Sequence, residues 1–227
     1  MSAPRLDTLM RTIDLYAAWL ESTGVSLDAQ GFPCLPREWY AQEMPAEMVP
    51  FHRRVMITCA PDRAALCFYT SDQCLYPRLA RIRRDLGTYR SFGAVVGMDV
   101  TVTRDMDPEW QREIMLLNSL FTAVLGANGV KVIANLRCGH ESTLPFLEAI
   151  PMGVPCASEV LGCARTEADD QSYLDKLLQV RPSMVLLYGK WDRHMQEQVG
   201  STGIPWKRYP DAHSRCRQAY RNRLQRP

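Results

Sequence analysis

The sequence lacks the short glycine- and serine-centred motifs that mark the commonest nucleotide-binding and hydrolase classes. Its 227 residues contain no Walker loop ending in lysine, no G-x-G-x-x-G after a strand-like run and no G-x-S-x-G elbow. No internal repeat and no low-complexity segment is present, which argues against repeat architectures. A chain of this length can nevertheless bury enough surface to be stable without disulfides or metals.

Long apolar runs are also missing. No window approaches the ~20 apolar residues of a membrane-spanning helix, and the N-terminal stretch does not have the order of a secretory signal. We therefore expect a cytoplasmic protein with no membrane partner, and reduced thiols at its eight cysteines.

No C-x-x-C pair occurs, and His140 is the only histidine near Cys138, so the spacing of a closed zinc site is absent. The metal and cofactor content stays open.

Charge is small overall but unevenly distributed. The net charge is +2, yet from Lys207 to Pro227 seven basic residues oppose the single acid Asp211, so this segment carries +6 and the rest of the chain −4. Apolar residues at helical spacing predict a basic C-terminal helix or tail over residues 211–227. A solvated tail and a nucleic-acid-binding segment are both compatible with this pattern. The nucleic-acid-binding candidates are Arg215, Arg217, Arg221 and Arg223.

The N-terminal segment, residues 1–50, is expected to be a helix followed by an irregular wrap. Asp7 is a plausible N-cap for a helix to about Ser22, and Gly24 suits its stop. The following stretch to Pro50 is rich in proline, which disfavours regular structure.

Residues 51–210 carry alternating strand-like and helix-like patterns. The predicted strands are 54–59, 65–70, 94–99, 130–136, 154–160, 184–188 and 204–209. The predicted helices are 76–85, 107–127, 144–150, 169–180 and 191–199. Strand–helix alternation at this spacing indicates parallel pairing with right-handed crossovers. The sequence therefore predicts an α/β core domain of alternating β/α layers with a mainly parallel sheet, either an open sheet or a partial barrel.

Each predicted strand of the second half is apolar and then ends in polar residues. Ligands bind at the carboxyl ends of parallel strands, because the loops there vary while the sheet holds them rigid. Asp99 and Glu159 are the candidate catalytic residues, as general acid–base groups or as oxygen ligands of a hard metal. Asn135 and Arg137 share one face of their strand, and the planar fork of Arg137 suits carboxylate or phosphate.

Further candidates for ligand binding follow the same strands, namely Glu141, Tyr188 and Lys190. The alternative interpretation of the whole set is a network of ion pairs that ties the strand ends together. His140 is either a base that titrates near neutral pH or an ordinary loop residue. Cys138 and Cys163 lie at loop starts, although most free cysteines are simply buried.

From about residue 68 to 189 the chain resembles the uncharacterised bacterial and phage family known as domain of unknown function 4417. The likeness rests on Phe68-Tyr69, Asp99, the run from Asn128 to Arg137, Ile150-Pro151-Met152-Gly153, Gly162-Cys163 and the run from Leu186 to Gly189. The chain departs from the family pattern in two places. Met98-Asp99-Val100-Thr101 stands where Pro-Asp-Phe-Ser is usual, and Cys138 stands where the family has tryptophan. The resemblance implies a phage, prophage or plasmid setting and no established activity.

Three functions fit these observations. The first is an accessory protein of a mobile element that binds a phosphate-bearing partner, either nucleic acid or a nucleotide. The second is a β/α-type enzyme that uses the carboxylates at its strand ends. The third is an interaction protein that blocks a host defence or replication factor.

Overall fold

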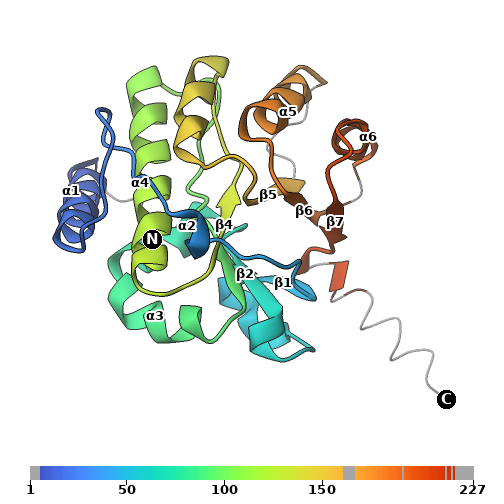
Figure 1. Cartoon of the computed structure of the whole chain (residues 1–227), viewed down its shortest axis with the longest axis horizontal. Coiled ribbons are helices and arrows are strands. Elements are labelled where there is room, and N and C mark those ends of the chain that lie inside the picture. The colour runs from blue at the N-terminus through green and yellow to red at the C-terminus, as the bar shows by residue number, and fades with distance from the viewer. Residues whose placement is uncertain (1–5, 161–166, 191, 213, 216, 218–227) are drawn as a thin grey trace.

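The computed structural model describes residues 6–160, 167–190, 192–212, 214, 215 and 217 (Figure 1). Within them, seven strands form one sheet in which every neighbouring pair is parallel and follows in chain order. The strands are β1 (Glu47–Pro50), β2 (Ala64–Cys67), β3 (Ala94–Val96), β4 (Val132–Asn135), β5 (Pro155–Val160), β6 (Met184–Gly189) and β7 (Trp206–Tyr209). The sheet curves into a nearly closed barrel, which decides between the two predicted arrangements.

Side chains join the two ends of the sheet where no ladder of backbone hydrogen bonds does. The Tyr209 hydroxyl donates to the Pro45 carbonyl at 2.7 Å, and Lys207 Nζ donates to the same oxygen at 3.0 Å. The guanidinium of Arg215 donates to the Met56 carbonyl at 3.0 Å and pairs with Glu47 at the start of β1. Barrel closure therefore depends on a few side chains at the seam between β1 and β7.

Helices alternate with the strands, as the sequence pattern predicts. They are α1 (Leu6–Ser22), α2 (Asp72–Ala80), α3 (Ile82–Arg90), α4 (Pro108–Ala127), α5 (Glu167–Val180) and α6 (Arg193–Ser201). Short 3₁₀ segments are η1 (Arg37–Trp39), η2 (Phe51–Met56), η3 (Pro61–Arg63) and η4 (Glu141–Ala149). In Figure 1 the outermost helix, α1, lies beside α4, while α5 and α6 stand on the other side of the molecule. None of the helices in the described ranges is long and apolar enough to cross a membrane.

The predicted cap of α4 is confirmed. The Asp107 carboxylate accepts hydrogen bonds from the amides of Glu109 and Trp110 at 3.0 and 3.2 Å, and Pro108 occupies the first turn. The helix ends at Ala127 with Asn128 as its C-cap, and Gly129 follows with a φ of 78°. α1 is anchored across the fold by the Tyr16 hydroxyl, which donates to the Leu79 carbonyl at 2.7 Å.

Two apolar clusters stabilise the barrel. The larger lies between the sheet and the helices and includes Phe68, Tyr89 and Phe121, whose rings pack edge to face. The smaller lies inside the barrel, where alternate residues of each strand meet, and includes Met48 and Ile133. Burial on both faces explains the nearly continuous apolar character of β6.

Three predicted elements differ from the structure. The strand predicted at 54–59 is wrong: residues 51–56 form η2, and the first strand is Glu47–Pro50, inside the predicted proline-rich wrap. Proline is tolerated there because β1 has a ladder partner on one edge only. The segment boundary predicted at residue 50 therefore falls directly after a barrel strand. The helix predicted at 76–85 is two helices, which meet at Arg81. The helix predicted at 144–150 is the 3₁₀ segment η4, which contains Pro145.

Candidate functional site

The segment that follows β3 places Asp99 at the carboxyl end of the barrel. Met98 and Val100 are buried in the outer core, and alternation turns Asp99 the other way. Asn118 on α4 fixes this segment, because its side chain accepts from the Val100 amide and donates to the Val100 carbonyl, both at 3.0 Å. Asp72 at the start of α2 accepts from the Thr101 amide and hydroxyl at 3.0 and 2.9 Å.

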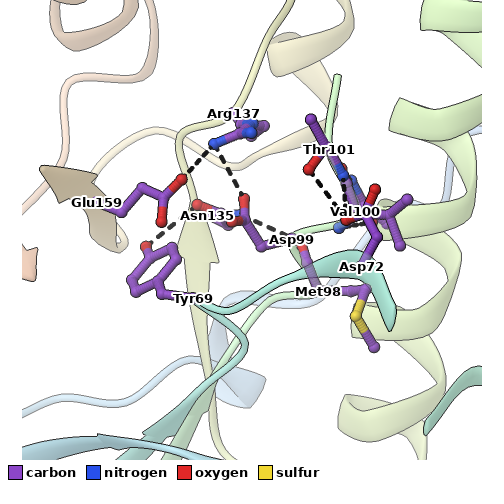
Figure 2. A network of polar contacts seen from close by, with 10 residues as sticks. Tyr69, Asp72, Met98, Asp99, Val100, Thr101, Asn135, Arg137 and Glu159 are labelled. Atoms are coloured by element: carbon purple, nitrogen blue, oxygen red, sulfur yellow. Dashed lines mark hydrogen bonds and ion pairs between the residues drawn. The ribbon is translucent and has the colours of Figure 1, made fainter. Parts of the chain in front are cut away.

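Asn135, at the end of β4, orients the Asp99 carboxylate. Its Nδ2 donates to Asp99 Oδ1 at 2.8 Å and to the Met98 carbonyl at 3.1 Å. The Tyr69 hydroxyl donates to Asn135 Oδ1 at 3.2 Å, which keeps the amide nitrogen turned toward Asp99. Figure 2 shows this chain of contacts from Tyr69 through Asn135 to Asp99.

Arg137 lies between two carboxylates. Its Nη1 is 2.7 Å from Glu159 Oε1 and 3.7 Å from Asp99 Oδ1 (Figure 2). The exposed fractions of these side chains are 3% for Asp99, 14% for Arg137 and 13% for Glu159. One guanidinium therefore faces two carboxyl groups in a largely desolvated place.

The pKa of Asp99 reflects this environment. Burial raises the pKa of its carboxyl group to about 7, and repulsion from Glu159 and Asp72 acts in the same direction. The charge of Arg137 and the hydrogen bond from Asn135 lower this pKa but do not offset the burial. Within the described ranges no donor reaches Asp99 Oδ2, so this oxygen can carry the proton. Near neutral pH Asp99 is poised between its acid and its base form.

The neighbouring side chains inside the barrel remain neutral. Burial raises the pKa of the Tyr69 hydroxyl and of the Cys67 thiol well above their ordinary values. Tyr69 therefore acts as a hydrogen-bond donor, and Cys67 does not supply a thiolate nucleophile.

A cavity of about 60 Å³ lies beside the cluster, between β4, α4 and η4. Asn135 and Arg137 line it on one side, and apolar side chains such as Phe32, Met115 and Phe146 line much of the rest. Because a cavity of about 150 Å³ holds a benzene ring, this one has room for about two or three non-hydrogen atoms. The polar cluster thus adjoins a small apolar space.

The family model described as Domain of unknown function (DUF4417) matches residues 27–205. The chain belongs to this family. The match includes the sequence-level resemblance over residues 68–189 and extends through β1 at one end and α6 at the other. No curated protein and no solved structure matches the chain.

Four of the predicted site residues of this DUF4417 protein meet at the strand ends, namely Asp99, Asn135, Arg137 and Glu159. Tyr188 lies inside the barrel, where its ring stacks on Tyr69 with 5.4 Å between centroids and its hydroxyl accepts from the Ala212 amide. Lys190 is exposed directly after β6. Glu141 is exposed at the start of η4 and pairs with Arg104 at 3.1 Å.

His140 and Cys138 both have structural roles. His140 precedes η4 and caps it, since its Nδ1 accepts from the Ser142 amide at 3.2 Å. Cys138 is buried and free, as are Cys67 and Cys156. In the described part of the chain no group of three or more His, Cys, Asp or Glu residues could hold a metal ion. Cys163 lies outside the described residues.

The structure describes two of the four candidate arginines of the C-terminal segment. Arg215 is largely buried at the barrel seam, where it pairs with Glu47 and donates to the Met56 carbonyl. Arg217 is exposed at the end of the described helical residues. Arg221 and Arg223 lie outside the described residues.

Three residues of the site are missing from the sequence-based prediction, namely Tyr69, Asp72 and Asn118. Tyr69 could have been found by alternation with Cys67, because both point into the barrel. Asn118 has a clear signal, as a polar residue within the apolar run of α4. Asp72 has none, because its partner Thr101 is 29 positions away.

Proposed function

We propose that this DUF4417 protein is an enzyme in which Asp99 acts as a general acid–base group on a small molecule bound at the carboxyl ends of the barrel strands. The observation that carries the proposal is the buried Asp99 carboxyl group, whose pKa of about 7 suits proton transfer near neutral pH. Its position supports the proposal, because parallel β/α barrels carry their chemistry at this end.

The neighbouring residues suggest distinct roles. The guanidinium of Arg137 would bind a carboxylate or phosphate of the substrate, which would replace Glu159 as its partner. Asn135 and Tyr69 are positioning residues, because they act on the substrate only through the orientation of Asp99. The apolar cavity beside Arg137 would accept a short apolar branch of two or three non-hydrogen atoms, consistent with its size of about 60 Å³.

A purely structural ion pair explains the cluster less well. In such a pair the arginine stabilises the ionised carboxylate, and the carboxyl pKa falls below its usual range. At Asp99 the pKa rises although Arg137 is near, so the fold holds an ionisable group where its charge is disfavoured. Such an arrangement weakens stability and is typical of functional sites.

The test is turnover of a panel of chromogenic carboxylic esters, phosphate esters and glycosides by the wild type and two variants. Asp99→Asn removes the proposed acid–base group. Asp85→Asn is the matched control, because Asp85 is also buried and pairs with an arginine, Arg78, at 2.7 Å, but lies on α3. We expect turnover of one class that falls by about 100-fold or more in Asp99→Asn and persists in Asp85→Asn. Equal turnover by the wild type and Asp99→Asn would overturn the proposal.

A second candidate function is binding of a phosphate-bearing partner, nucleic acid or a nucleotide, without chemistry. The observation that favours this function is the position of Arg137. Its side chain lines the cavity, and part of that side chain is exposed. In a phage, prophage or plasmid setting such binding would suit an accessory protein. Calorimetry with a nucleoside diphosphate would show binding that Arg137→Met removes and Arg78→Met keeps, whereas equal binding by both variants would exclude this site.

A further inference from the structure

A strongly basic surface lies on α3 and the adjoining 3₁₀ segment η2, and the proposed enzyme does not use it. We call it the arginine face. Its exposed cationic side chains are Arg53 on η2, and Arg81, Arg83, Arg84 and Arg90 on or next to α3. Segments 51–56 and 81–90 are far apart in sequence. They are neighbours in the fold because the Phe51 ring packs on Tyr89 with 5.2 Å between centroids.

This charge is left largely uncompensated. Among the described residues, no carboxylate forms an ion pair with the arginines at positions 53, 54, 81, 83, 84 or 90. The one acid paired within the region is Asp85, which binds Arg78 at 2.7 Å. Arg54 and Arg78 both stack over the Phe51 ring, at 4.7 and 5.2 Å from its centroid, so like charges are crowded around one side chain. The face therefore carries a concentrated positive potential.

The arginines of α3 form two rows. Ile82, Leu86 and Tyr89 are buried and define the inner side of the helix. Arg83 and Arg90, seven positions apart, lie along one flank, and Arg81 and Arg84, three apart, lie along the other. Between the rows lies Gly87, where a Cβ would meet nothing within 4 Å, so a backbone can approach this strip closely.

The dimensions fit a phosphodiester backbone. Residues 81–90 rise by about 13 Å along the helix axis at about 1.5 Å per residue. Over that distance one DNA strand presents about four phosphates. The region from 51 to 91 contains arginine and no lysine, and the planar guanidinium matches the oxygens of a phosphate. The exposed residues of α3 include no aromatic side chain, and the Trp19 ring beside this helix lies against the Arg83 guanidinium, 4.6 Å from it.

We propose that the arginine face binds the phosphate backbone of a nucleic acid. This inference does not rest on the proposed acid–base function, because it involves none of the residues at the strand ends. Base-edge contacts are not required for such binding, which is electrostatic and independent of sequence. An acidic protein partner is the alternative occupant that the test must distinguish.

The test is fluorescence anisotropy with a labelled DNA duplex of about 20 base pairs, and poly-glutamate as competitor, over a range of salt concentrations. With about four phosphates neutralised, the slope of log K against log salt is about −3.6, so affinity falls about 150-fold between about 50 and about 200 mM salt. Arg81→Gln combined with Arg84→Gln is expected to reduce the magnitude of the slope by about 1.8. Both arginines are exposed, so the variant retains the fold, which circular dichroism checks.

The matched control is Arg181→Gln combined with Arg193→Gln, which removes the same charge from two exposed arginines outside this face. We expect the control to bind with the wild-type slope, and poly-glutamate to compete weakly on a per-charge basis. Equal loss in both double variants would overturn the proposal, because it would show attraction by net charge alone. Absence of binding at low salt, or competition by poly-glutamate as strong as that by unlabelled DNA, would also overturn it.

Discussion

Replacing Asp99 with asparagine removes a charge that burial disfavours and keeps the shape of the side chain. The pKa of this carboxyl group rises from 3.8 to about 7 on folding. This difference corresponds to about 4 kcal/mol of preference for the protonated form in the folded state. The protonated Asp99 therefore contributes fully to the free energy of unfolding below about pH 4. This contribution is lost as pH rises toward about 7.

The comparison of the two proteins isolates this effect. Titrating groups outside the polar cluster contribute nearly equally to both proteins, so the difference in unfolding free energy reports on Asp99 and the charges coupled to it. Between about pH 4.5 and about pH 8, Asp99→Asn should gain about 3 kcal/mol relative to the wild type. For a chain of this size the gain corresponds to roughly 6 to 12 °C in Tm.

Urea denaturation followed by circular dichroism at a series of pH values measures the difference. The control is Asp85→Asn, in which an ion pair with Arg78 is broken and stability should fall throughout the range. A wild type that becomes more stable than Asp99→Asn as pH rises would contradict a raised Asp99 pKa. That result would mean that Arg137 stabilises the Asp99 carboxylate more than burial disfavours it.

Three further substitutions test the scaffold by urea denaturation. Arg215→Ala should lower the free energy of unfolding by about 2 to 4 kcal/mol, because it leaves Glu47 without its cationic partner at the barrel seam. An unchanged midpoint would show that this ion pair does not stabilise the seam. Asn118→Ala should cost about 2 to 4 kcal/mol, since two buried backbone groups lose their partners, and a cost below about 1 kcal/mol would contradict this. Gly93→Ala should cost about 1 to 3 kcal/mol, because its Cβ would overlap the Asp62 carbonyl, and full stability would show that the backbone can shift there.

Much of the architecture could be predicted because local patterns determine it. The cap at Asp107 and the stop at Gly129 bound α4 in the sequence and in the structure. The apolar runs that form β3 to β6 are likewise visible in the sequence. The sequence does not predict β1, because prolines suppress the strand signal and its pairing with β2 depends on residues outside the local window.

Closure of the barrel could not be predicted from the sequence. It depends on contacts between Tyr209 and Pro45 and between Arg215 and Glu47, more than 160 positions apart. No local pattern encodes contacts at that separation.

The polar cluster could be predicted in part from the sequence. Parallel strand ends lie together, which is why the convergence of Asp99, Asn135, Arg137 and Glu159 followed from their positions after the strands. Glu141 does not join them, because the turn after β4 directs it toward Arg104. The degree of burial of Asp99 depends on the packing of the whole barrel end, so it cannot be predicted from local sequence. The direction of the pKa shift depends on this burial and cannot be predicted either.

Titration of the Asp99 carboxyl group itself is the most direct test of the proposed acid–base centre. Carbon-13 NMR of protein labelled at the aspartate carboxyl carbons, with Asp99→Asn to assign the signal, measures its pKa in the folded state. We expect a midpoint of about 7. A midpoint at or below the ordinary aspartate value of about 3.9 would contradict it and would make the cluster a structural ion pair.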